Sequence, residues 1–196
     1  MRKHRIGKQV FISLLLVTCW LSAGDSFAVG VSLKVKDSSD SNEDRNEVII
    51  EDSNGDDQTT TTDTETEICT LTVTLKQSKV PLDSCQLEWY FLSEKTRNSK
   101  RKPEILVFSP GKKSISWGDK IVLTETITSE PFVFNRVSRS NSTSDDAEQG
   151  DVYKGYIVLV TQKGRIIAKS SNSSRYLKTE WLIKCKKAAR SLEEAY

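Results

Sequence analysis

The sequence predicts an all-β fold, an immunoglobulin-like antiparallel sandwich of about seven to nine strands with a C-terminal helix. Three observations support this prediction. Apolar and polar residues alternate with a period of two in most segments after residue 66, which is typical of half-buried strands. Turn residues separate these segments at intervals of about 8–12 residues. Only the last twenty or so residues show apolar positions three and four apart, as on a helix face.

Residues 1–28 have the organisation of a secretory signal peptide. Basic residues come first, a short apolar stretch follows at 10–21, and Ser26-Phe27-Ala28 forms a small-x-small cleavage site. We therefore expect a secreted or periplasmic protein. Lipoprotein anchoring at Cys19 is the alternative, but the neighbours of that cysteine fit a lipobox poorly. The apolar stretch is too short to cross a bilayer as a helix, and no later stretch is longer, so we expect no transmembrane span.

The only histidine of the chain is His4, which lies in this leader. The mature protein would therefore lack the most common general base and the most common metal ligand. Carboxylates are frequent, but no pair stands out from the turns and the acidic segment. We expect no catalytic residues, no bound metal and no cofactor, and hence a protein that is not an enzyme.

Residues 29–36 alternate and are expected to form the first strand of the sandwich. Residues 37–66 are expected to be a disordered acidic insertion. From Asp37 to Glu67 the chain has 12 acidic residues and one basic residue, Arg45. So little apolar surface cannot offset the entropy lost on ordering.

Half of a calcium-binding loop occurs inside this insertion. Asp52, Asn54 and Asp56 have the spacing of oxygen ligands in an EF-hand loop. Such a loop also needs glycine at its sixth position and glutamate at its twelfth. Here these positions hold Asp57 and Asp63, so specific calcium binding is not expected.

Residues 67–172 are expected to form the body of the sandwich. Proline and glycine at 109–111 indicate a turn, and Gly164 can take the positive φ of a tight hairpin between two late strands. The expected strands are 69–75, 85–92, 105–108, 115–117, 121–127, 132–137, 153–161 and 165–169.

Residues 173–196 are expected to form a C-terminal amphipathic helix and tail, with the helix at 176–194. Tyr176, Leu177, Trp181 and Cys185 recur at helical spacing and would dock on the sandwich. The basic residues of this helix could also touch an anionic membrane surface.

The order of these patterns resembles that of a protein group. An early alternating strand precedes a charged spacer, then Leu71-Thr72-Val73-Thr74-Leu75, Leu87-Glu88-Trp89-Tyr90-Phe91 and, late in the chain, Tyr153-Lys154-Gly155-Tyr156-Ile157-Val158. This order is similar to that of uncharacterised secreted β-sandwich proteins of planctomycete- and verrucomicrobium-type bacteria. The resemblance covers about residues 29–171, and the helical tail departs from it. It implies a fold and a compartment, and no site.

Three cysteines, Cys69, Cys85 and Cys185, would remain after cleavage of the leader. If the strands that begin at Cys69 and Cys85 are antiparallel neighbours, these two residues lie too far apart for a disulfide. Both share the apolar face of their strand, which favours burial as small hydrophobic residues. A bridge from Cys185 to one of them is the alternative.

Possible ligand contacts are Trp117 and the basic loop residues Arg97, Lys100, Arg101 and Lys102. Trp117 precedes a turn glycine, which favours an exposed ring, and the loop could attract anionic groups. Charged loops of this kind are often only solvated.

Trp89, by contrast, lies between Leu87 and Phe91 at two-residue spacing, so its ring is expected in the core. The favoured function is an exported, non-catalytic module that binds another protein or has a structural role in the cell envelope or extracellular space. The alternative is a carbohydrate-binding sandwich that uses Trp117 and the basic loop. The partner would be a protein or a polysaccharide; export and the acidic segment argue against nucleic acid.

Overall fold

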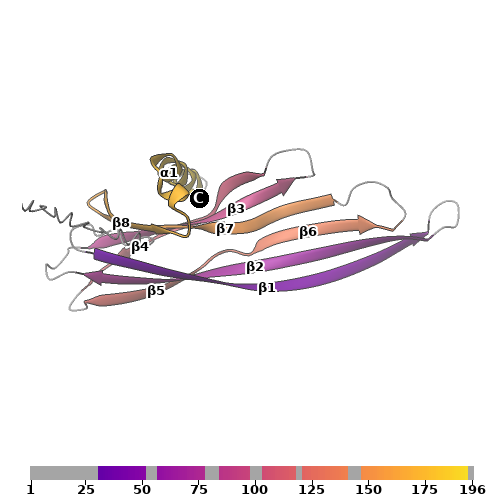
Figure 1. The fold of residues 1–196 in the computed structure, drawn as a ribbon, viewed down its shortest axis with the longest axis horizontal. Coiled ribbons are helices and arrows are strands. Elements are labelled where there is room, and N and C mark those ends of the chain that lie inside the picture. Colours follow the sequence, from indigo (N-terminus) through magenta and orange to yellow (C-terminus); the bar gives the residue numbers. More distant parts are fainter. Residues whose placement is uncertain are drawn as a thin grey trace, which may run out of the picture.

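The computed structural model describes residues 31–51, 57–77, 84–97, 103–117, 121–140 and 147–193. The molecule is elongated, with a helix beside one end of the β-structure and a long hairpin at the other (Figure 1). The elements in these ranges are β1 (Val31–Glu51), β2 (Asp57–Gln77), β3 (Cys85–Arg97), β4 (Glu104–Ile115), β5 (Val122–Thr128), β6 (Phe132–Arg139), β7 (Ala147–Gln162), β8 (Arg165–Ser171), a 3₁₀ turn η1 (Ser174–Leu177) and α1 (Thr179–Glu193).

All the paired strands are antiparallel, in the order β1-β2-β6-β7-β3-β4, with β5 added on β2 and β8 on β7. Two long strands change neighbour along their length. β2 pairs with β5 over residues 70–76 and with β6 over 60–67. β7 pairs with β8 from residue 157 onward and with β6 over 147–150. At one end the strands therefore form two layers, β1-β2-β5 and β8-β7-β3-β4, which β6 joins at the other end. The predicted sandwich with a C-terminal helix is confirmed.

The main core lies between these two layers and follows the two-residue period of the strands. On β2 the odd-numbered residues from Cys69 to Leu75 are fully buried. Phe132 stacks on Phe108 and also contacts Tyr153, so aromatic rings fill the space where β6 crosses between the layers. The buried residues of this interlayer core are Val31, Leu33, Cys69, Leu71, Val73, Leu75, Cys85, Leu87, Phe91, Ile115, Trp117, Ile127, Phe132, Tyr156, Val158, Val160 and Ala168.

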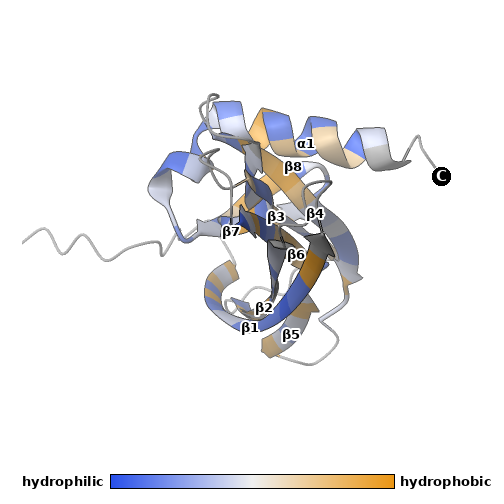
Figure 2. Ribbon diagram, turned by 90° about the vertical axis from the view of Figure 1, so that its right-hand side faces the viewer, coloured by the Kyte–Doolittle hydropathy of each residue, from blue (hydrophilic) through white to orange (hydrophobic). Residues whose placement is uncertain are grey.

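A second core lies on the opposite face of β7, β3 and β4, beneath α1. Figure 2 shows the helix lying across this layer. Tyr90, Leu92, Ile157 and Leu159 project from the strands and pack against Tyr176 and the helix. This explains why β7 is buried on both faces from Gly155 to Thr161, whereas β2 keeps one face partly exposed.

The partly exposed face of β2 consists largely of threonine. Thr70, Thr72 and Thr74 lie directly opposite three threonines of β5. Threonine has a high strand propensity, and paired threonines on neighbouring strands stabilise a sheet. The same even-numbered pattern continues from residue 60 to residue 66.

The prediction of a disordered acidic insertion at 37–66 is wrong for residues 37–51 and 57–66. These residues belong to β1 and β2, which pair from Val31↔Gln77 to Glu51↔Asp57 without a register shift. The segment buries little, since every described β1 side chain from residue 36 onward is exposed. The segment is stabilised instead by backbone pairing and by the high strand propensity of threonine. It also continues strands that are already packed in the core at their other end. The residues of the calcium-like half-loop, 52–56, lie outside the described ranges.

The turn predicted at 109–111 is also wrong. These residues continue β4, and the register with β3 shifts between Phe91 and Leu92, which leaves Phe108 as the extra residue of a bulge. Gly111 lies opposite Trp89 and is needed there, because a Cβ at this position would overlap the indole ring. Proline and glycine thus mark a bulged, closely packed strand at the sheet edge.

Two other predictions of local structure are confirmed. β7 and β8 are joined by Lys163 and Gly164, with φ of 49° and 75°, the positive values that a two-residue hairpin turn requires. The amphipathic helix is present, although residues 174–177 form a 3₁₀ turn before it. In the part of the chain that the structure describes, α1 is too short and too polar to cross a membrane, and no other helix could do so.

Candidate functional site

The expected exposed ring of Trp117 is wrong. Its side chain is only 4% exposed and belongs to the interlayer core. Its indole N–H is buried and has no hydrogen-bond partner among the described residues. The turn glycine that follows does not bring the ring to the surface, because residue 117 still follows the inward side of β4, two positions after buried Ile115. Trp117 therefore cannot serve as a binding platform.

The predicted contacts in the basic loop lie outside the part of the chain whose side chains the structure describes. Arg97 is the last residue of β3, and its side chain, like Lys100, Arg101 and Lys102, lies outside the described residues. Trp89, which is predicted in the core, is only half-buried: its ring packs against the interlayer core and over Gly111.

An acidic surface covers the half of the hairpin that extends beyond the sandwich. We call this half the arm, from the pair Asp40↔Ile68 to the pair Glu51↔Asp57. Residues directly opposite each other point to the same face. The register therefore places one set of charged side chains on a single face of β1, β2, β6 and β7. This set is Glu43, Arg45, Glu47, Asp63, Glu65, Glu67, Arg136 and Glu148.

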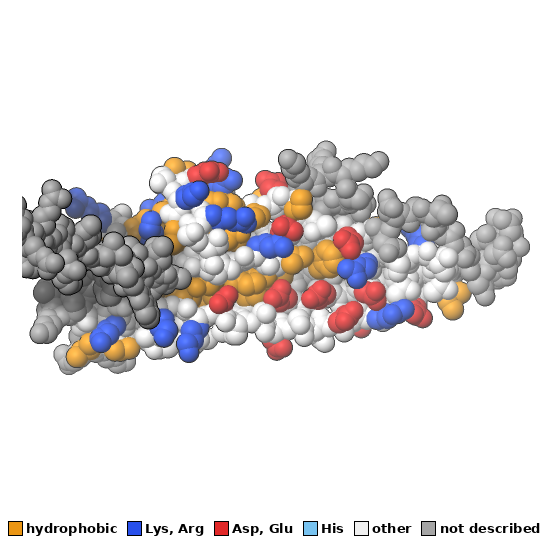
Figure 3. Space-filling view, in the orientation of Figure 1, with side chains coloured by type: hydrophobic (Ala, Val, Ile, Leu, Met, Phe, Trp, Pro, Cys, Tyr) orange, Lys and Arg blue, Asp and Glu red, His pale blue; other side chains and the backbone are white. Residues whose placement is uncertain are grey.

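The two cations on this face are already paired. Arg45 lies 3.0 Å from Glu47 and 3.8 Å from Asp63, and Arg136 lies 3.1 Å from Glu148. Glu43 and Glu65 face each other directly and form no ion pair with another described residue. Figure 3 shows acidic side chains following the lower strands, with basic ones at only a few points. The arm thus has a surplus of negative charge.

Polar and apolar surfaces meet where the arm joins the core. Tyr153 donates a hydrogen bond to Asp37 at 3.4 Å, and the Cys69 thiol lies 3.9 Å from the Glu67 carboxylate. Burial, followed by the negative charges of Glu67 and Asp37, raises the pKa of Cys69 to about 12. Burial and Asp37 also raise the pKa of Tyr153 far above its ordinary value. Both groups remain protonated at neutral pH, so neither provides a nucleophile.

The other two described cysteines are also buried. Cys69, Cys85 and Cys185 are all buried and none forms a disulfide, so the proposed bridge from Cys185 is wrong. Burial raises the pKa of Cys185, under α1, to about 12. Within the described ranges, no cluster of three or more histidine, cysteine or carboxylate side chains could hold a metal ion.

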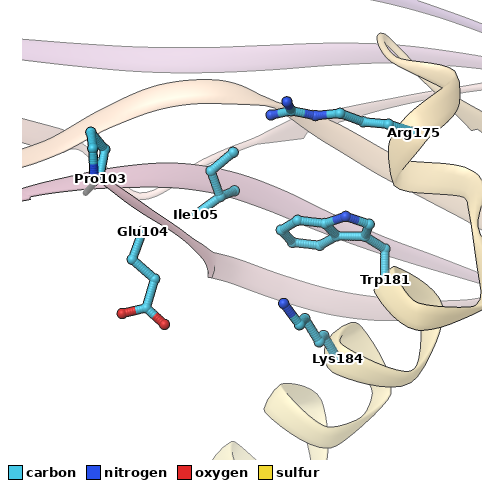
Figure 4. Close-up of a pocket in the computed structure, with 6 residues that line it drawn as sticks. All are labelled: Pro103, Glu104, Ile105, Arg175, Trp181 and Lys184. Atoms are coloured by element: carbon cyan, nitrogen blue, oxygen red, sulfur yellow. The ribbon is translucent and has the colours of Figure 1, made fainter.

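A groove of about 510 Å³ lies between the start of β4 and the start of α1. Its lining combines one aromatic ring, two cations and one carboxylate with two apolar residues (Figure 4). The lining residues are Pro103, Glu104, Ile105, Arg175, Trp181 and Lys184.

The cations of this groove are held in place by aromatic rings. The Lys184 ammonium lies 4.7 Å from the centroid of the Trp181 ring, and the Arg175 guanidinium lies 4.6 Å from that of Tyr176. Arg175 also donates a hydrogen bond to the Tyr176 hydroxyl. Tyr176 and Trp181 meet edge to face, with centroids 5.1 Å apart, so buried Tyr176 fixes the indole. Figure 4 shows Trp181 between the two cations.

Sequence reasoning missed this groove because each part had a simpler explanation. Trp181 occupies an apolar position of an amphipathic helix, and Lys184 belongs to a basic helical cluster. Only the three-residue spacing of Trp181 and Lys184, which places them on one helix face, could have indicated the pair. Nothing in the sequence brings Glu104 to them.

No protein-family model matches the chain, and no curated protein matches it. Among solved structures, the chain is similar to a crystal structure of a protein from Akkermansia muciniphila. The two are 12% identical with a TM-score of 0.27, and the similarity covers 76% of this chain and 76% of that chain. A similarity of this degree assigns no activity. Membership in a group of secreted planctomycete- and verrucomicrobium-type proteins stays a prediction.

Proposed function

We propose that the protein is an exported, non-catalytic β-sandwich module that binds another protein, in the cell envelope or outside the cell, through its arm. The observation that carries this proposal is the outer edge of β1. β1 is the last strand of the sheet order and pairs with β2 alone over 21 residues. No other described strand pairs with its outer edge, and an added strand could pair there with the backbone groups of β1.

The charge of the arm supports a basic partner. A strand added beside β1 would lie next to Asp40, Glu43 and Asp44, all of which are exposed. Lysine or arginine side chains on such a strand would offset the surplus of carboxylates, including the facing pair Glu43 and Glu65. Near the tip, Val48 and Ile49 are 54% and 66% exposed and add apolar contact area. An extended basic segment of another protein fits both features.

The proposal of export depends on the signal-like residues 1–28. The proposal of a non-catalytic role depends on the position of His4 in that leader. The raised pKa values of Cys69 and Cys185 also support a non-catalytic role, because these thiols are not ionised at neutral pH. A carbohydrate-binding function through Trp117 is not retained, since its ring is buried.

Site-specific photo-cross-linking in the native host tests the proposal. A photoreactive residue at Ser41, on exposed β1, should capture one discrete protein, whereas the same residue at exposed Arg165, in the β7–β8 hairpin, should not. The Glu43→Lys/Glu65→Lys double variant should weaken the capture at Ser41 by reversing the charge. Equal capture from both positions, or capture unchanged by the double variant, would refute the arm as the contact element.

A further inference from the structure

We propose that the groove between β4 and α1 binds an acidic sugar residue of an anionic polysaccharide. The site is separate from the arm and does not depend on the function proposed for it. Its lining comes from two parts of the chain that are distant in sequence: the start of β4 with the residue before it, and the adjacent elements η1 and α1.

The charges of the groove favour an anion. Arg175 forms no ion pair with another described residue, and its guanidinium is held over Tyr176. Lys184 is 3.6 Å from Glu180, but that pair is exposed on both sides and therefore weak. A ligand carboxylate at either Arg175 or Lys184 would meet a cation held in place by an aromatic ring, which lowers the entropy lost on binding.

The remaining groups favour a sugar over a simple anion. Glu104 forms no ion pair with another described residue and would repel a bare phosphate or sulfate, yet it can accept hydrogen bonds from hydroxyl groups. The indole N–H of Trp181 lies on the side of Arg175 and can donate (Figure 4). Ile105 gives an apolar contact for the C–H groups of a pyranose beside the indole. A hydroxylated sugar ring with one carboxylate can therefore interact with the cations, with the Glu104 carboxylate and with the apolar side chain of Ile105.

Titration calorimetry with uronate tetrasaccharides tests this assignment. The probes are tetrasaccharides of galacturonate, glucuronate and mannuronate, each compared with its methyl ester, which has the same sugar without the charge. We expect at least one acid form to bind and its ester to bind at least tenfold more weakly. Binding of none of the acid forms, or equal binding of acid and ester, would overturn the proposal.

Two matched lysine variants locate the binding. Lys184→Gln should weaken binding about tenfold, the effect expected for a hydrogen bond between charged groups. Lys187→Gln, on the same helix and also exposed but outside the groove, should change it less than twofold. Trp181→Phe keeps an apolar ring but removes the N–H and should also weaken binding, with the melting temperature measured as a folding control. Binding unaffected by Lys184→Gln would overturn the site.

Two further probes separate the sugar from other anions. Sodium sulfate and a penta-glutamate peptide should each bind at least tenfold more weakly than the best uronate. If sulfate binds as tightly, the groove is a general anion site. If penta-glutamate binds as tightly, the ligand is an acidic peptide. Either result would overturn the assignment to a saccharide.

Discussion

The two halves of β2 both pair with β1 but have opposite chemistry. In the packed half, the odd-numbered residues Cys69, Leu71, Val73 and Leu75 are fully buried between two layers. In the arm, the same face continues with Glu67, Glu65 and Asp63. The even-numbered face is mostly threonine in both halves.

This difference shows that a segment of this chain can form a paired strand without contributing to the apolar core. In the arm, alternation, threonine propensity and the pairing of β2 with both β1 and β6 maintain the strands without a buried core. Only the packed half gains free energy from burying apolar surface, at roughly 25 cal/mol per Å². We therefore expect the stability of the protein to depend on the packed half and the charge of its surface to depend on the arm.

The largest effect is expected from truncation in the packed half. Trp117→Ala removes a ring that is 4% exposed and should lower the free energy of unfolding by about 3–5 kcal/mol. Ile49→Ala in the arm, where the side chain is 66% exposed, should change it by no more than about 0.5 kcal/mol. Urea denaturation of both variants measures the contrast. A similar decrease in the free energy of unfolding for both variants would show that the two halves contribute equally to stability.

A smaller loss is expected from a substitution that overfills the packed half. Gly111→Ala would place a methyl group against the indole of Trp89 and should cost about 1–3 kcal/mol. Ser41→Ala, on exposed β1, is the matched control in the arm and should be near neutral. In the double variant Gly111→Ala/Trp89→Leu, part of the penalty should disappear, because the clashing ring is gone. A penalty for Gly111→Ala that is independent of Trp89 would contradict this explanation.

Alkaline pH should destabilise the packed half through its thiols. The pKa values of Cys69 and Cys185 are about 12 in the folded protein, against an ordinary value of 9.0. Above pH 9 the unfolded chain therefore releases these protons first, so stability is complete below pH 9 and falls as the pH rises towards 12. Urea midpoints at pH 7, 9 and 10.5 should decrease only over the last interval. The Cys185→Ala variant should show a shallower decrease, and an unchanged slope would exclude the thiol as a cause.

The smallest effect, and the only gain, is expected in the arm. Glu43 and Glu65 are directly opposite and repel each other. Glu43→Lys replaces the repulsion with attraction and should stabilise the protein by about 0.5–1 kcal/mol. Glu43→Gln should give about half of the gain, and 0.5 M salt should reduce both gains by screening. A loss of stability with Glu43→Lys would contradict repulsion between Glu43 and Glu65.

Much of the fold could be predicted from local pattern. The strands that include Leu71 and Leu87 can be predicted because buried residues alternate with less buried ones. The strand that includes Val158 can be predicted because its residues are continuously apolar. The hairpin at Gly164 was found because two-residue turns require positive φ there. The arm was missed because its carboxylates resemble those of disordered chains, although its threonines keep the strand period. Proline and glycine at 110 and 111 misled the prediction of β4, because a bulged edge strand tolerates both.

The candidate site could be predicted far less well. Trp117 was expected at the surface from its neighbour Gly118, and the ring is inside. The groove at Trp181 depends on the packing of α1 against the start of β4, which joins residues about 70–80 positions apart. A pattern read along the chain reports which face of an element is apolar and does not report which other element covers it.

The sequence by itself determined the fold class, the core-facing side of β3 and the amphipathic helix, because each depends on the spacing of apolar residues within one segment. The tertiary structure decided the rest. It decided that β2 exchanges β5 for β6 along its length, that the acidic segment is a paired arm, and that Arg175, Trp181 and Glu104 line one groove. These features depend on contacts between distant segments, whose free energy no local pattern contains.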